Sequence, residues 1–170
     1  MKSIKNLFIL CFMAFAVAMT AQTDAISKHF SSYVNNSDFN VIYISPQMMD
    51  MIAEIDDDTD KDVKEALDNL SGLRILTTAK TPADFYKKAT STLGSSDLKS
   101  LMTMKSATGE NVNFFVRNAG DKTEELLMVV GGDEFVMLSM EGDINLRKVS
   151  KLAKALDIKG AEHLEELKNQ

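Results

Sequence analysis

Three apolar segments of strand length follow one another late in the chain, and this run constrains the fold more than any other feature. They cover residues 111–118, 124–131 and 134–141. Gly120-Asp121 separates the first two, and Gly131-Gly132-Asp133 separates the second from the third. Glycine tolerates the positive φ angles of tight hairpin turns. Because such short connections favour antiparallel neighbours, the sequence predicts an antiparallel meander.

The chain before this run alternates between helical and strand patterns. The spacing of apolar residues predicts helices over 26–34, 46–55, 63–70 and 82–93, strands over 38–45 and 73–79, and further helices over 146–156 and 161–168. Residues 98–107 fit either a helix end or a strand. The segment 38–45 is apolar on both strand faces, as an interior strand would be. These elements predict one α+β domain: a mixed sheet with a C-terminal antiparallel meander and helices packed mainly on one face.

Two of the predicted helices begin with the same pair of residue types. Ser45-Pro46 and Thr81-Pro82 each place a capping hydroxyl before a proline at the first helical position. Asp84 adds a weak capping box to the second pair. A repeated junction of this common kind indicates coincidence rather than an internal duplication.

The first residues have the pattern of a secretory leader. Lys2 and Lys5 precede an apolar run from Leu7 to Met19, and small residues follow at 20–21. The run is shorter than the roughly 20 residues that a membrane span requires. We expect residues 1–21 to be a cleaved signal peptide and residues 22–170 to be a single domain, with cleavage after Ala18 as the alternative. The protein would then be exported, to the periplasm or the cell exterior.

Charge and cysteine content exclude several classes of function. Removing two lysines and no acids from 19 basic and 25 acidic residues leaves a formal charge of −8. An acidic protein of this kind opposes binding to nucleic acid. Cys11, the one cysteine, lies in the predicted leader, so the mature chain has no disulfide, thiol nucleophile or zinc ribbon. No later segment is long and apolar enough to span a membrane.

An acidic segment, EIDDDTDKD, occupies residues 54–62. Read as a calcium loop from Asp56 or from Asp58, it lacks the glycine at position 6 and the glutamate at position 12 that the EF-hand requires. Acids at a helix N-terminus interact favourably with its unpaired N–H groups, and Asp58 or Thr59 can serve as the N-cap. The sequence therefore favours a polar helix start, and metal binding by Asp56–Asp62 is the alternative.

Methionine is frequent, and thioethers are ligands for Cu(I). Eight methionines lie after residue 21: Met48, Met49, Met51, Met102, Met104, Met128, Met137 and Met140. Helical spacing predicts that Met48 and Met51 point inward with Ile52 and Ile55, and that Met49 alone lies off the apolar face. Methionine as an adaptable filler of the core explains this set better than a copper site does.

Catalytic motifs are missing from the sequence. The two histidines, His29 and His163, have no partner at metal-binding spacing, and there is no nucleophile elbow, P-loop or dinucleotide fingerprint. With 25 acidic residues some carboxylate pair will always be suitably spaced, so an unrecognised hydrolase stays open as an alternative. We assign no catalytic, cofactor-binding or metal-binding residues and no cofactor.

The ending LLMVVGGDEFVMLSMEGDINLRKVSKLAKAL, residues 126–156, resembles the domain of unknown function 4252 family, uncharacterised exported proteins of Gram-negative bacteria. The strand pair, the turn at residues 142–146 and the leader carry the likeness. It implies export and fold but no activity. Relatives with a lipoprotein cysteine differ from this chain, so tethering is not implied.

Together these features favour a non-enzymatic binding or interaction module of the cell envelope. Its partner would be another envelope protein or a second copy, and its natural contact site would be an apolar sheet face that helices leave uncovered.

Overall fold

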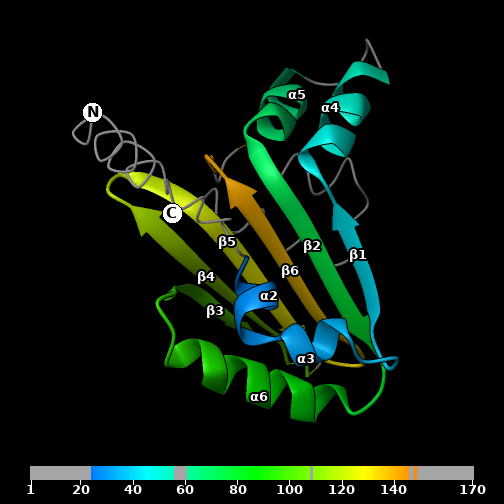
Figure 1. The fold of residues 1–170 in the computed structure, drawn as a ribbon. Helices are drawn as coiled ribbons and strands as arrows, with labels where there is room; N and C mark the ends of the chain where they lie inside the picture. Colours follow the sequence, from blue (N-terminus) through cyan, green and yellow to red (C-terminus); the bar gives the residue numbers. More distant parts are fainter. Residues whose placement is uncertain (1–23, 56–60, 108, 146–147, 149–170) are drawn as a thin grey trace, which may run out of the picture.

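In the computed structural model, residues 24–55, 61–107, 109–145 and 148 are described. They form one six-stranded sheet in the order β1-β2-β6-β5-β4-β3 (Figure 1). The elements are α2 (Ala25–His29), α3 (Ser31–Val34), β1 (Asn40–Ile44), α4 (Pro46–Ile55), α5 (Lys61–Asp68), β2 (Leu70–Thr78), α6 (Pro82–Gly94), β3 (Lys99–Lys105), β4 (Asn111–Ala119), β5 (Lys122–Gly131) and β6 (Phe135–Gly142).

The predicted meander is confirmed. β4, β5 and β6 pair in sequence order, with Phe114 opposite Met128 and Met128 opposite Leu138. Gly120, at the turn between β4 and β5, has a φ angle of 61°, a conformation in which a side chain would be strained. The α+β class is also confirmed, and where the sequence suggested a mixed sheet, all five strand pairings are antiparallel.

The first half of the chain adds strands at both sides of the meander. β1 is followed by α4 and α5, and the chain then returns as β2, which pairs with β1 on one side and with β6 on the other. The chain then passes across one face of the sheet as α6 and adds β3 on the far side of β4. Residues 98–107, ambiguous in sequence, thus form a strand. The two edges of the sheet are β1 and β3.

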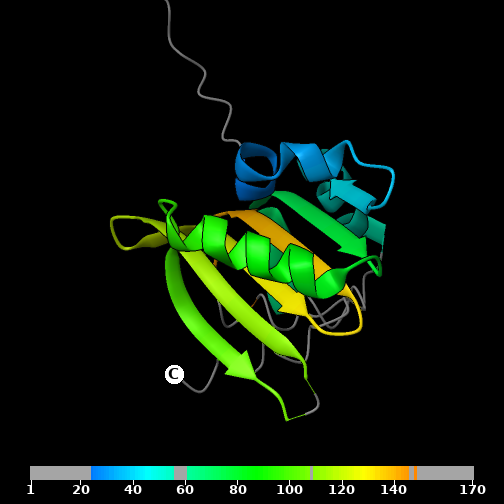
Figure 2. The same ribbon diagram turned by 90° about the horizontal axis from the view of Figure 1, so that it is seen from below.

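Apolar side chains are buried on both faces of the sheet. On one face, α2, α3 and α6 cover a cluster that includes Ile26, Phe30, Leu93, Leu127 and Met137, and Figure 2 shows these three helices on the same side of the strands. On the other face, α4 and α5 contribute to a second cluster; its members include Met49, Leu67, Phe114, Met128 and Leu138. No helix in the described part of the chain is long and apolar enough to cross a membrane.

Helix starts behave differently at the two proline junctions. The Ser45 hydroxyl accepts a hydrogen bond from the backbone N–H of Met48, 3.3 Å away, so this cap is confirmed. Thr81 lies at the N-cap of α6 but makes no side-chain cap bond. Its backbone is left-handed, with a φ angle of 38°, whereas a capping residue typically has an extended backbone. The predicted cap at Thr81 was therefore wrong.

Three further expectations change. The helix over 26–34 is broken at Phe30 into α2 and α3, although its predicted apolar residues stay at least partly buried. The strand predicted to be interior, β1, is an edge strand. Apolar residues on both faces of a strand indicate removal from water, but they do not say whether the cover comes from the same chain. The predicted leader (1–21) and the predicted helix over 161–168 lie outside the described residues, and the helix over 146–156 lies almost wholly outside them.

Candidate functional site

A group of ionisable side chains lies on the α2 face of the sheet, at the end that α6 does not cover. The strand register brings Glu141 opposite Glu125, and Glu125 opposite Arg117. Arg74 is opposite Ser139 one pair further along. Alternate residues of a strand share a face, so these side chains belong to the same face as Leu76, Leu127 and Met137.

Glu125 is the centre of this group and is fully buried. Its Oε1 atom accepts hydrogen bonds from the Ser139 hydroxyl and from the backbone N–H of Ala25, each at 2.6 Å. Its Oε2 atom lies 2.8 Å from Arg117 Nη2. Burial raises the pKa of Glu125, while these bonds and the Arg117 charge act in the opposite direction. Oε1 therefore ties the start of α2 to β5 and β6, and Oε2 forms an ion pair with Arg117 of β4.

A second ion pair fixes the same helix to β2. Asp24 caps α2 by accepting bonds from Ser27, and its Oδ2 atom lies 3.0 Å from Arg74 Nε. The Arg74 guanidinium lies over the Tyr43 ring of β1, 4.7 Å from its centroid. Two carboxylates, Asp24 and Glu125, thus anchor α2 to the sheet, and Arg74 also contacts the edge strand through Tyr43.

Glu141 also has a raised pKa. It is 8% exposed, and burial together with the nearby Asp24 and Glu125 charges raises its pKa to about 7, although Arg117 and Arg74 act in the opposite direction. Its Oε1 atom lies 4.0 Å from Arg117 Nη2, beyond hydrogen-bond distance. A carboxyl with this pKa exchanges a proton near neutral pH.

Sequence reasoning missed this cluster. The signal was present, because Arg74, Arg117, Glu125 and Glu141 are charged residues inside apolar strand segments. A charge at such a position has to be paired when it is buried. The contacts of Glu125 and Asp24 form a clamp for α2, because both acids accept hydrogen bonds at the start of that helix. Glu141 Oε1, in contrast, has no hydrogen-bond partner in the described structure.

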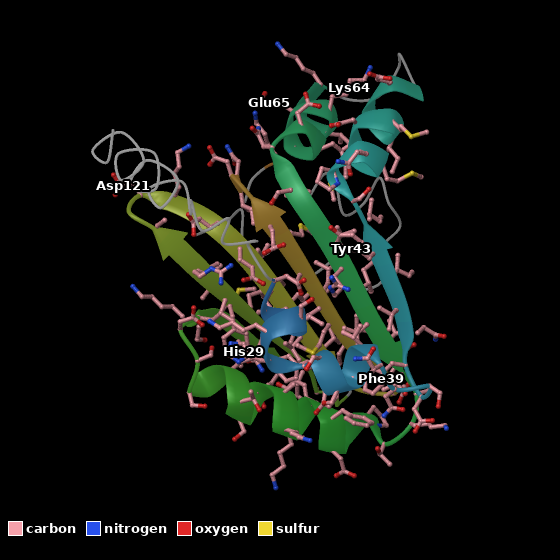
Figure 3. All side chains as sticks on the ribbon, viewed as in Figure 1. His29, Phe39, Tyr43, Lys64, Glu65 and Asp121 are labelled. Atoms are coloured by element: carbon pink, nitrogen blue, oxygen red, sulfur yellow. The ribbon has the colours of Figure 1, made fainter. Side chains whose placement is uncertain are left out.

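The exposed apolar surface lies elsewhere, on β1 and α4. Five large apolar side chains of the described residues remain exposed, and we call them the β1–α4 strip: Val41 (37%), Ile42 (52%), Tyr43 (54%), Met48 (46%) and Met51 (56%). Figure 3 shows Tyr43 on the edge strand. The predicted contact site, an uncovered sheet face, is replaced by an uncovered edge, because in the described part of the chain both faces of the inner strands carry buried apolar clusters.

The orientation of α4 corrects a second prediction. Met49 is buried at 2% exposure, whereas Met48 and Met51 are exposed. The prediction that Met48 and Met51 point inward was therefore wrong, and so was the outward placement of Met49. The helix carries apolar residues on most of its circumference, so its pattern does not fix which side docks. The junction with β1 turns Met49 and Ile52 toward the sheet instead.

The fold does not bring the methionines together as ligands for a Cu(I) site. Met48 and Met51 belong to α4, which follows the edge strand β1, while Met102 and Met104 belong to β3 at the opposite edge of the six-stranded sheet. Met128, Met137 and Met140 are fully buried in the core, as predicted.

The other candidate metal ligands, the acidic segment and the two histidines, lie only partly within the described residues. Within the described residues no group of three or more His, Cys, Asp or Glu side chains is arranged to hold a metal ion. Asp56, Asp58 and Asp60 of the acidic segment lie outside those residues, as does His163. His29 lies on α2 with its Nε2 atom 3.7 Å from Asp97 Oδ1.

Comparison with known proteins gives one match. The family model described as Domain of unknown function (DUF4252) matches residues 33–152, a span that includes all six strands. Neither the curated proteins nor the solved structures include a match to the chain.

Proposed function

The chain belongs to the DUF4252 family, and from its own geometry we propose that it is an exported, non-enzymatic interaction module of the cell envelope. Its contact surface is the β1–α4 strip. The observation that supports this proposal most strongly is the position of the exposed apolar residues. All large apolar side chains that are exposed in the described structure lie in one segment, residues 41–51. Contiguous exposed apolar patches mark interaction sites in soluble proteins.

The backbone of β1 supports the same function. β1 pairs only with β2 in the described structure, so the outward-facing N–H and C=O groups of Asn40–Ile44 are available to another strand. Natural proteins block such edges with charges, prolines or bulges when contact is unwanted. β1 has none of these: its residues are NVIYI and its ladder with β2 is regular.

Export rests on the composition of residues 1–21, a basic start followed by an apolar run and small residues. An envelope location is also consistent with an unprotected edge strand, because a partner can cover it after export. N-terminal sequencing of the protein purified from cells that express the full chain tests this part of the proposal. The expected sequence begins at Gln22, and an intact Met1 in the cytosolic fraction would contradict export.

The contact surface is tested by a photo-crosslinking residue placed at Ile42 or, as the matched control, at Ser100 on the opposite edge strand. Both positions are exposed in edge strands. Irradiation of intact cells should give envelope adducts from position 42 and none from position 100. Absence of an adduct at position 42, or equal adducts at both positions, would contradict the assignment of this surface.

A further inference from the structure

We infer that the partner of the β1–α4 strip is a second copy of this chain, joined by antiparallel pairing of β1 with β1 about a two-fold axis. This inference rests on the proposed function, because it names the occupant of the same surface. The two sheets would then form one continuous sheet with β1 and its copy at the centre. Each copy uses the same residues, as a two-fold interface requires.

The sequence of β1 is suited to pairing with itself. With the axis at Ile42, the middle residue of Asn40–Ile44, all five residues of each strand find a partner. Ile42 then faces Ile42 of the second copy, and Val41 faces Tyr43. Pairs of an aromatic with a β-branched residue, and pairs of β-branched residues, are among the stabilising cross-strand pairs.

The two faces of the joined sheet are also consistent. Val41 and Tyr43 lie on the α2 face, opposite Leu76 and Arg74 of β2. Ile42 is opposite Ile75, which packs against the core of the other face. Antiparallel pairing in this register brings like faces together, so each of the three side chains meets an apolar partner on its own side of the sheet.

Charge favours this surface for contact between identical chains. Each full chain carries a formal charge of −6, so two copies repel at most orientations. Residues 39–49 contain no charged side chain. Asp38, which precedes them, is paired with Lys80 in the same chain. Asp50, exposed on α4, is the one charged residue between positions 41 and 51. Two acidic molecules can therefore approach along β1 itself without setting like charges against each other.

The available area indicates a weak dimer. Five side chains that are between 37% and 56% exposed offer roughly 400 Å² on each copy. Standard interfaces bury about 800 Å² on each partner. An interface of about half the standard size belongs to the class of weak, transient contacts, so the association is expected to be reversible.

The test uses sedimentation velocity over a concentration series, on the protein expressed with its own leader and purified. Wild type should shift from monomer to dimer as concentration rises. Ile42→Lys and Ile42→Glu should each raise the dissociation constant about tenfold or more, because like charges then face each other across the axis. An equimolar mixture of the two variants should associate again. Ser100→Lys, which adds the same charge at the other edge, should leave the constant unchanged.

Two results would overturn the inference: a wild-type protein that is monomeric throughout, or a mixture that associates no better than its components. If wild type is monomeric while position 42 crosslinks to a different protein in cells, the second copy is rejected and the contact surface stands. If the Ile42 variants are unfolded by circular dichroism, Val41→Lys with Tyr43→Glu is compared with Val41→Glu with Tyr43→Glu. The first pair places opposite charges across the axis and should dimerise; the second places like charges and should not.

Discussion

At one edge of the sheet, β1 runs for five residues without a charged side chain; at the other, β3 begins with Lys99 and ends with Lys105. The ladder of β1 is regular, whereas β3 has a bulge between Ser100 and Met102. Lysines and bulges are the devices by which edge strands avoid joining other molecules. One edge of the sheet thus carries protective features and the other does not, a difference that agrees with the proposed contact through β1.

The largest expected effect comes from comparing a substitution in the core with a substitution in the β1–α4 strip. Met49→Ala should lower the free energy of unfolding by about 2–4 kcal/mol, because Met49 is buried at 2% exposure and its loss leaves a cavity. Met51→Ala, at 56% exposure on the same helix, should change it by less than about 0.5 kcal/mol and weaken dimerisation instead. Urea unfolding and sedimentation measure the two effects. The reverse pattern would show that the strip is loosely packed core.

Ionisation of the buried acids should change the stability of the fold without affecting association through either edge strand. The pKa of Glu141 is raised to about 7 in the folded protein. Because a carboxyl with a raised pKa binds its proton more tightly when folded, stability is greatest below the unfolded-state pKa, about 4.3, and falls as pH rises toward 7. Glu125, whose pKa is also raised, adds a decline of the same sign.

Glu141→Gln should therefore reduce this decline and stabilise the protein at pH 8 by about 1–2 kcal/mol relative to wild type, a figure reduced from the full shift to allow for solvent screening. The difference should shrink toward pH 4. Chemical denaturation across this pH range measures it, and equal pH dependence in both proteins would contradict the raised pKa. The dimer dissociation constant should not differ between the two proteins at any pH, since Glu141 lies outside the strip.

The smallest expected effect concerns the two features that protect the β3 edge, its terminal lysines and its bulge. Lys99→Val with Lys105→Val removes the charges and leaves the bulge between Ser100 and Met102. We expect self-association to strengthen by no more than about threefold, because the bulge still distorts the edge. Sedimentation of the double variant tests this. Association through β3 as strong as that through β1 would show that charge alone distinguishes the edges.

The sequence allowed much of this architecture to be predicted. The three apolar segments of strand length and the glycine-containing turns between them predicted the meander. Connections of only a few residues favour antiparallel pairing of the strands that they join. The burial of Met128, Met137 and Met140 followed from their position in those strands. The α+β class followed from the order of helices and strands.

The features that carry the proposed function were those that local pattern could not determine. An apolar strand looks the same whether it lies inside a sheet or at an edge, so β1 was placed inside. The docking side of α4 depends on the geometry of its junction with β1 rather than on spacing, so Met49 and Met51 were interchanged. The clamp of Glu125 and Arg117 joins residues of neighbouring strands to α2, and such pairing depends on a register that a single sequence does not specify.

Cysteine pairing at the centre of the proposed interface tests the account most directly. In a chain with Cys11 replaced by serine, Ile42→Cys places one thiol of each copy at the two-fold axis, where directly opposed Cβ atoms lie about 4.5–5.5 Å apart. A disulfide needs about 3.5–4.5 Å, so a small closing movement brings the two thiols into bonding range. Mild oxidation should give disulfide-linked dimers with Ile42→Cys and none with Ser100→Cys. Val41→Cys and Tyr43→Cys should link to each other when mixed and poorly when alone. Equal linkage at positions 42 and 100, or none at 42 under conditions where wild type dimerises, would contradict pairing through β1.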